Sequence, residues 1–408
     1  MIEWSEQHLM IRDAVRRFIE AEIKPNLEAL EHGDMLPYPI LRKMIGTFGL
    51  DEVARQRFAR RIEREKAAHA RGEPAPAAER SGGDGVDAGM QLIPVIELCR
   101  YCPGMVTAMG VSAGLTAGTI LSKGTIGQKE RWALPLLTLE KIGSWAITEP
   151  GSGSDAFGGM KSTARRDGDQ YVLNGNKTFI TNGPHADTIV FICKLDDGAE
   201  PKDRKVMSFV LERGTPGLTQ SRPLRKMGLH SSPTGELFLE DVRVGREHLL
   251  GETEDVPYRA GAKETFSAER AGVAAMALGI VEQCRALSLD YARTRVQFGR
   301  PIGKFQLIQL KLAKMEVARM NLENSVFRQI EMAAAGKSMS LAEASACKLY
   351  AAGAAMEVAL EAVQLFGGNG YMASYQVEQL CRDAKVLQIY GGTDEIQISQ
   401  IARSLLAG

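Results

Sequence analysis

The residues best suited to chemistry lie in the run Trp145-Ala-Ile-Thr-Glu-Pro-Gly-Ser-Gly-Ser-Asp155. An apolar segment leads into a Pro-Gly turn, and three residues carry hydroxyl groups: Thr148, Ser152 and Ser154. Such a turn can bring backbone N–H groups and hydroxyl donors close to a flat ring with polar edges. The Gly-x-Gly within it lacks the third glycine and the strand–turn–helix context of a Rossmann turn. We therefore expect a ligand held by loop donors.

Two further runs carry groups that suit a phosphate or the close approach of a ligand. Arg295-Val-Gln-Phe-Gly-Arg-Pro-Ile-Gly303 begins with a guanidinium, whose planar fork matches a pyrophosphate. Gln364-Leu-Phe-Gly-Gly-Asn-Gly-Tyr371 follows an apolar helical pattern, so its glycines predict a helix end with left-handed residues. Those glycines also let a ligand approach the backbone. A plain helix end and a ligand contact are compatible in this run.

These runs, together with two others, resemble the motifs of the acyl-CoA dehydrogenase family. The other two are Asn174-Gly-Asn-Lys-Thr-Phe-Ile-Thr-Asn-Gly183 and Gln388-Ile-Tyr-Gly-Gly-Thr-Asp-Glu-Ile-Gln397. The resemblance extends from about residue 90 to the C-terminus. It implies FAD as the cofactor, an acyl-CoA substrate and electron-transfer flavoprotein as the electron acceptor. It also implies a homotetramer, or dimer of dimers, in which a neighbouring subunit completes the adenine end of the FAD site.

The residues that the resemblance assigns to the site are spread over all five motifs. The implied cofactor-binding residues are Trp145, Ile147, Thr148, Ser154, Phe179, Thr181, Arg295, Gln297, Phe298, Gln306, Gln364, Leu365, Gly367, Gly368, Thr393 and Glu395. The implied substrate-binding residues are Ser154, Arg270 and Gly392, and no metal ligand is implied.

The catalytic carboxylate is missing from its most common place. Dehydrogenation of an acyl-CoA removes an α-proton and a β-hydride, and the proton needs a base within reach. Many family members carry a Glu directly after the Tyr of the last motif, where this chain has Gly391. A subset that includes isovaleryl- and long-chain-type dehydrogenases supplies it from a helix whose pattern ends in Glu-Arg, which Phe266-Ser-Ala-Glu-Arg270 matches. Glu269 is therefore the candidate base, although an exposed Glu in a first helical turn would also suit the helix dipole.

Gly391 leaves the enzymatic role open to alternatives. Its backbone N–H can still stabilise the charge that develops on the thioester oxygen. The leading hypothesis is dehydrogenation of an acyl-CoA to the trans-2-enoyl-CoA. The alternatives are an acyl-CoA oxidase or flavin monooxygenase on the same scaffold, or a protein that binds flavin or acyl-CoA without turnover.

The elements that must position these residues follow the order helices, strands, helices. We expect an α+β multidomain fold with an N-terminal helical domain (1–142), a middle antiparallel β-barrel or sandwich domain (143–250) and a C-terminal helical bundle (251–408). The expected hairpin turns are Asp167-Gly168, Asn174-Gly175 and Asn182-Gly183. The long helices expected in the bundle are 268–295, 306–335, 341–366 and 393–406. Ser5 is the expected N-cap of the first helix.

Residues 51–88 differ in composition from their surroundings. Residues 51–71 are dense in Arg, Glu and Ala and predict an exposed helix, whereas 72–87 are rich in Gly, Pro and Ala. Relative to the family pattern this segment is an insertion. It is either a solvated surface loop or a lid that alters access to the acyl tail.

Composition excludes several classes of function. The chain has 50 basic and 50 acidic side chains, so no global field attracts nucleic acid. We see no run of about 18 apolar residues and no leader sequence, so we expect no membrane span and a cytoplasmic location. Cys99-Arg-Tyr-Cys102 has no second pair to complete a zinc site, and we expect ordinary thiols. His230 is expected to be structural.

Overall fold

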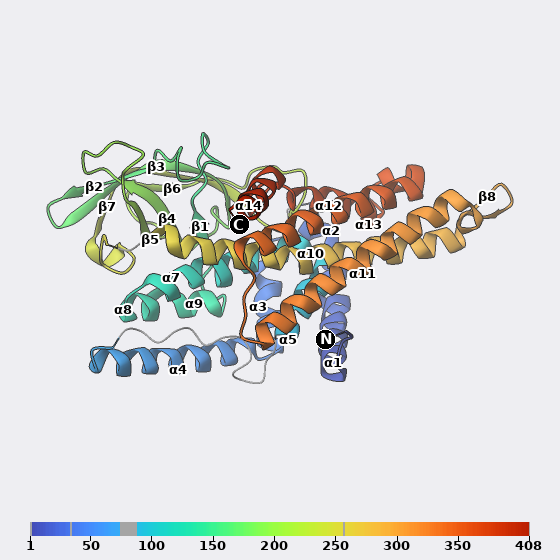
Figure 1. Cartoon of the computed structure of the whole chain (residues 1–408), viewed down its shortest axis with the longest axis horizontal. Helices are drawn as coiled ribbons and strands as arrows, with labels where there is room; N and C mark the ends of the chain where they lie inside the picture. The colour runs from blue at the N-terminus through green and yellow to red at the C-terminus, as the bar shows by residue number, and fades with distance from the viewer. Residues whose placement is uncertain (1, 33–34, 74–87, 256–257, 408) are drawn as a thin grey trace.

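A computed structural model describes residues 2–32, 35–73, 88–255 and 258–407, with side chains described from residue 269 onward in the last range. Helices, a β-sheet and more helices follow one another along the chain, which confirms the expected fold class (Figure 1). The sheet lies at one end of the molecule, and the long C-terminal helices extend away from it. The Gly-rich part of the expected insertion falls mostly outside the described residues.

The N-terminal part consists of helices and short helical turns. Ser5 caps the first helix as expected, since its hydroxyl accepts a hydrogen bond from the backbone of His8. The segments are α1 (Glu6–Phe18), η1 (Ile19–Ile23), η2 (Lys24–Asn26), α2 (Leu27–Glu31), α3 (Tyr38–Thr47), α4 (Leu50–Ala70), α5 (Ala88–Cys99), α6 (Pro103–Met109), η3 (Gly110–Thr116), α7 (Ala117–Lys123), α8 (Ile126–Gln128), η4 (Lys129–Ala133) and α9 (Leu134–Leu137). The arginine-rich stretch therefore forms helix α4, as expected, and buries one side through Phe58 and Ile62.

The middle part is a seven-stranded sheet with the order β1-β4-β2-β3-β7-β6, in which β5 also pairs with β4. Its strands are β1 (Gly143–Ala146), β2 (Thr163–Asp167), β3 (Gln170–Thr181), β4 (Thr188–Leu195), β5 (Val206–Glu212), β6 (Leu218–Gln220) and β7 (Thr234–Gly245), and the 3₁₀ turn η5 (Arg246–His248) follows. Most pairings are antiparallel, but β4 runs parallel to both β1 and β2. The sheet is thus mixed, whereas the strand pattern predicted an antiparallel one.

Only one of the three expected hairpin turns joins paired strands. Asp167-Gly168 connects β2 to β3, and Gly168 adopts φ +65° as the turn requires. Asn174-Gly175 instead lies inside β3 at a register shift. Glycine suits this position because a Cβ atom on Gly175 would lie 2.1 Å from the hydroxyl oxygen of Ser162. Asn182-Gly183 is a turn between β3 and β4, which do not pair with each other.

The C-terminal part is the expected helical bundle. Its elements are α10 (Tyr258–Thr294), the two-stranded hairpin β8 (Val296–Gln297) and β9 (Arg300–Pro301), η6 (Ile302–Lys304), α11 (Gln306–Ala334), α12 (Leu341–Phe366), η7 (Gly367–Tyr371), α13 (Gln376–Val386) and α14 (Asp394–Leu406). Helix α10 begins ten residues before the expected start. Ser340 and Glu343 form a capping box that fixes the start of α12.

The N-terminal and C-terminal helices share one hydrophobic core. Buried residues from both parts form a single cluster that includes Ile19, Leu98, Val281, Leu322 and Ala355. A second cluster belongs to the sheet alone. The helical parts therefore stabilise each other, since each covers apolar surface of the other.

Three helical stretches are long and apolar enough to cross a membrane: Pro103–Lys123, Glu269–Thr294 and Leu341–Tyr371. From the sequence we expected none. Between 50% and 67% of each apolar window is buried inside the fold, so the shared core uses much of this apolar surface.

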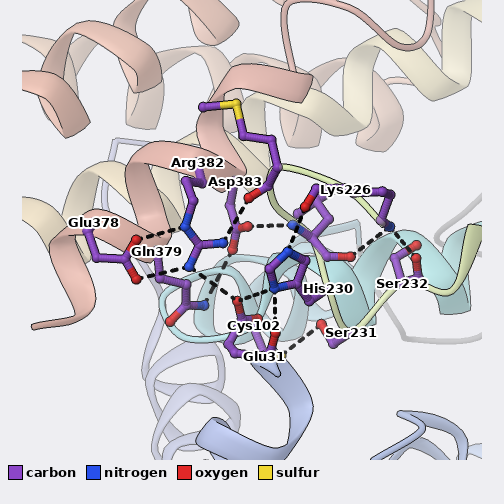
Figure 2. A network of polar contacts seen from close by, with 12 residues as sticks. Glu31, Cys102, Lys226, His230, Ser231, Ser232, Glu378, Gln379, Arg382 and Asp383 are labelled. Carbon is purple, nitrogen blue, oxygen red and sulfur yellow. Dashed lines mark hydrogen bonds and ion pairs between the residues drawn. The ribbon is translucent and has the colours of Figure 1, made fainter. Parts of the chain in front are cut away.

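A buried polar junction ties the sheet to both helical parts (Figure 2). His230, in the loop before β7, contacts the backbone carbonyls of Glu31 and Lys226 through its two ring nitrogens. Asp383 on α13 accepts a hydrogen bond from the backbone N–H of Leu229. Both ring nitrogens of His230 are engaged by backbone, which supports the expected structural role.

The cysteines Cys99 and Cys102 are both buried free thiols, as expected. The thiol of Cys102 donates to the Ser231 hydroxyl at 3.0 Å. Burial raises the pKa of both thiols. Within the described residues no group of His, Cys, Asp and Glu side chains could hold a metal ion.

Candidate active site

The carboxylate of Glu269 lies against the backbone of Gly391, and this contact defines the candidate active site. A Cβ atom placed on Gly391 would lie 3.5 Å from both Cδ and Oε1 of Glu269. The Glu269 carboxylate therefore occupies the space that a side chain at position 391 would enter. The structure thus brings together the two positions that the sequence hypothesis linked.

Burial shifts the pKa of Glu269 into the range that suits a general base. Desolvation raises its pKa to about 7, while the positive charges of Arg270 and Lys348 act in the opposite direction. A carboxyl group with a pKa near neutrality can accept a proton and release it again at physiological pH.

The loop that carries Gly391 is a left-handed turn fixed through its carbonyl groups. Gly391 and Gly392 adopt φ +63° and +91°, a conformation that glycine adopts at little cost. The buried amide of Gln397 donates to the carbonyls of Gly391 (3.1 Å) and Gly392 (2.7 Å). Arg270 Nε donates to the Gly391 carbonyl at 3.3 Å. The carbonyl of Gly391 is thus anchored from α10 and from α14.

Arg270 lies beneath this loop. Its residue is only 7% exposed, and its Nη1 donates to the Ser345 hydroxyl on α12 at 3.0 Å. This placement favours a role in holding the loop over the direct substrate contact expected from the sequence. Gly392 lies in the same turn, and a Cβ there would lie 2.8 Å from Gln397 Nε2.

A second group of expected site residues lies together in the sheet domain. The backbone N–H of Thr178 donates to the Thr148 carbonyl at 3.0 Å, which places the first motif beside the second. The neighbouring Phe179 adopts φ +57° at a register shift, and 68% of its surface is exposed. A bulky residue with positive φ is strained, and such strain is common where a side chain is presented to a ligand.

The remaining expected residues of this sheet region differ in exposure. Ser154 is exposed, Trp145 and Thr181 are half-buried, and Ile147 is buried. Ser154 is thus accessible to a ligand, whereas Ile147 packs in a hydrophobic cluster shared by the sheet and N-terminal helices.

Glu149 and Lys177 organise this region, and sequence reasoning missed both. Lys177 is fully buried, and its Nζ contacts the Ile147 carbonyl (3.0 Å) and Glu149 Oε1 (2.8 Å). Glu149 also accepts hydrogen bonds from the backbone N–H groups of Lys161 and Ser162. The pair fixes the turn after Thr148. The available signal was a lysine inside an otherwise β-forming run.

A third group lies at the far end of the bundle. Phe298 forms the tip of the β8–β9 hairpin with φ +51° and is 92% exposed. The ring of Tyr291 stacks on Phe366 at 4.1 Å between centroids, which brings the hairpin beside the glycine run after α12. Figure 1 shows this hairpin at the opposite end of the molecule from the sheet. One chain therefore does not bring the third group to the first two.

The other expected residues of the third group vary in exposure. Arg295, Gln297, Gln306, Gln364, Gly367 and Gly368 are exposed, whereas Leu365 is buried in the bundle core. Leu365 can therefore offer a ligand little beyond its backbone. In the loop that follows Gly391, Thr393 is the N-cap residue of α14 without a side-chain cap bond, and Glu395 is exposed.

Comparison with known proteins identifies the family. Family models of the acyl-CoA dehydrogenase N-terminal, middle and C-terminal domains match residues 51–140, 144–242 and 260–406. The chain belongs to the acyl-CoA dehydrogenase family. The N-terminal match begins at residue 51, so it includes the segment 51–88, which we interpret from the sequence as an insertion relative to the family pattern.

Similar proteins include named acyl-CoA dehydrogenases and solved structures of the family. The short-chain-specific acyl-CoA dehydrogenase of Megasphaera elsdenii is 40% identical over 80% of this chain and 84% of its own length. The structure of butyryl-CoA dehydrogenase from M. elsdenii covers 100% of both chains with a TM-score of 0.83 and 33% identity. An acyl-CoA dehydrogenase from Bacillus anthracis, solved with FAD, covers 99% of this chain and 68% of its own, with a TM-score of 0.84 and 29% identity.

Membership makes this acyl-CoA dehydrogenase an FAD-dependent oxidoreductase of the kind that serves fatty acid β-oxidation. Its residues fit the cofactor. The exposed ring of Phe179, the half-buried Thr148 and the exposed Ser154 offer an aromatic surface and hydroxyl donors at one end. At the other end, a Cβ on Gly367 or Gly368 would meet no atom within 4 Å, so the backbone there is open to a ligand.

Proposed function

We propose that Glu269 is the catalytic base that removes the α-proton of an acyl-CoA, giving the trans-2-enoyl-CoA. The observation that carries this proposal is the position of its carboxylate over Gly391. Its pKa of about 7 supports the role, because the ionised form is available at neutral pH. FAD, when bound, supplies the acceptor for the β-hydride.

The loop contributes an oxyanion donor. Removal of the α-proton places enolate-like charge on the thioester oxygen, which a backbone N–H can stabilise. We assign this role to the N–H of Gly391. Gln397 and Arg270 support it, because they bond the carbonyls of Gly391 and Gly392 and so restrict the conformation of the turn directly after this N–H. Ser154 and Gly392 would lie beside the thioester.

Cofactor binding would use residues from two subunits. Trp145, Thr148 and Phe179 would hold the flavin ring, and Arg295 from a neighbouring subunit would meet the pyrophosphate. The distance between the sheet and the hairpin in one chain supports this division (Figure 1). We propose that the subunits associate as a homotetramer. Helix α11 offers a surface for this association, because it carries four exposed apolar residues: Leu307, Leu310, Val317 and Met320.

The test of the base is Glu269→Gln. The variant should retain yellow, bound flavin but lose its bleaching by acyl-CoA by at least about 10³-fold, because a neutral amide cannot accept the proton. Glu282→Gln is the matched control, since Glu282 is also a half-buried carboxyl on α10 whose pKa is raised by burial. Near-normal bleaching in Glu269→Gln would exclude the assignment.

Substrate and acceptor can be tested with the same signal. We propose short acyl-CoAs as the first substrates, because the M. elsdenii relative is named short-chain specific. Bleaching would be measured with straight and branched acyl-CoAs of roughly four to sixteen carbons, and its rate would rank these substrates. We propose electron-transfer flavoprotein as the acceptor and the cytoplasm as the location. Reoxidation of substrate-reduced flavin by air within seconds would instead indicate an oxidase.

A further inference from the structure

Lys348 is a buried cation next to the catalytic loop. It lies on α12 in an apolar, alanine-rich stretch, its side chain is 0% exposed, and its Nζ lies 3.1 Å from Asp394 Oδ1. An ammonium group is costly to bury unless it is paired, so this interaction is strongly constrained.

Asp394 joins the two ends of the loop that carries Gly391. Its Oδ2 accepts a hydrogen bond from Gln388 Nε2 at 3.0 Å, and its backbone N–H donates to the Gln388 carbonyl at 3.1 Å. The loop of residues 388–394 is thus closed on itself at Asp394, and Lys348 ties that closure to α12.

Helix α12 contacts the loop at a second point. Ser345 lies one turn before Lys348 and accepts a hydrogen bond from Arg270, which in turn donates to the Gly391 carbonyl. One face of α12 therefore fixes both the closing residue of the loop and the arginine beneath it. No motif assigned Lys348 or Ser345 a role in the site, and Asp394 was part of the last motif without a positioning role.

We propose that Lys348 and Asp394 are a positioning pair that holds loop 388–394 in place and sets the charge that Glu269 faces. The proposal rests on the proposed function of Glu269 as the base. Neither residue is assigned a contact with substrate. Lys348 acts through the loop and through its charge.

The charges around Glu269 give the pair a distinctive signature. Facing Glu269 are Arg270 on its own helix, Lys348 on α12 and the buried phenol of Tyr390 in the loop. Lys348 lowers the pKa of Glu269, and Asp394 offsets part of the charge of Lys348. Removal of Lys348 should therefore raise the pKa of Glu269, whereas removal of the Asp394 charge should lower it.

The experiment compares Lys348→Met with Asp394→Asn in the FAD-bound enzyme. Each variant should lose roughly 10- to 100-fold in kcat, because small displacements of a catalytic loop are costly. The midpoint of the pH profile of kcat/KM should move up by about one unit in Lys348→Met and down by a smaller amount in Asp394→Asn. Lys348→Arg should restore the midpoint, since it keeps the charge.

An exposed pair of the same chemistry is the matched control. Lys205 and Asp255 lie 3.0 Å apart, with 52% and 86% of their side chains exposed. Lys205→Met and Asp255→Asn should leave kcat and the pH midpoint unchanged, because water screens exposed charges. Flavin content and melting temperature would report whether each variant folds.

The outcomes separate this proposal from the proposed function. If Glu269→Gln retains activity, the assignment of the base is wrong. If Glu269→Gln is inactive but the midpoints of Lys348→Met and Asp394→Asn stay unchanged or move together, only the positioning role is wrong. If Lys348→Met does not fold, the pH midpoint of Asp394→Asn tests the positioning role alone: a downward shift supports it, and an unchanged midpoint refutes it.

Discussion

Glu269 owes its expected chemistry to two opposing influences on one carboxyl group. Burial raises its pKa to about 7, and the neighbouring cations prevent a larger rise. A general base must be ionised, so kcat/KM should rise about tenfold per pH unit below pH 7 and level off above it. Initial rates between pH 5.5 and 9 would measure this profile. A plateau that extends below pH 6 would contradict the assignment of Glu269.

At the scale of helices and strands, features formed by residues close in sequence could be predicted from the sequence. Contacts between residues far apart in sequence could not. The N-cap at Ser5, the long bundle helices and the five motifs are local patterns. The pairing of Lys177 with Glu149 and of Lys348 with Asp394 depends on how strands and helices pack. The contact between Glu269 on α10 and the Gly391 loop could be anticipated only because the resemblance linked positions 269 and 391.

Strand register shows the same limit. Asn174-Gly175 has the composition of a hairpin turn, yet it lies within the long strand β3. There Gly175 leaves room for Ser162, which packs against its backbone. The sequence shows a glycine at this position, but only the packing of the neighbouring segment shows why a side chain would not fit there.

The junction between the sheet and both helical parts should make stability depend on pH. Glu31 is buried on α2, its carboxyl oxygens accept no hydrogen bond from the described residues, and desolvation raises its pKa to about 8. Between pH 4.5 and 8 the unfolded chain ionises this group while the folded chain keeps it protonated. Folding stability should therefore fall as pH rises, by up to about 1.4 kcal/mol per unit.

Melting temperatures of Glu31→Gln would test this slope. Relative to the wild type, the variant should gain stability at pH 8 compared with pH 5.5, because it lacks the proton that the wild type must hold. Asp383 also has a raised pKa and should leave part of the slope in place. Glu28→Gln, an exposed residue on the same helix, should follow the wild type at every pH. Parallel curves for Glu31→Gln and the wild type would refute the expectation.

The whole molecule separates the two groups of residues that we assign to one FAD site. Thr148 and Phe179 lie in the sheet domain, and the exposed hairpin around Phe298 lies at the other end of the chain (Figure 1). Glu269 contacts the loop of its own chain. A complete site would then combine the base of one subunit with the hairpin of another.

Mixed oligomers would test this division directly. One tagged subunit would carry Glu269→Gln, and a second would carry Arg295→Ala and Phe298→Ser, so that each homo-oligomer is inactive. If sites are shared between two subunits that pair at random, about a quarter of the sites in a co-expressed mixture should be intact, because both defects fall on the same site in each mixed pair. If every site is built from one chain, each site keeps one defect, and the mixture should be as inactive as its parents.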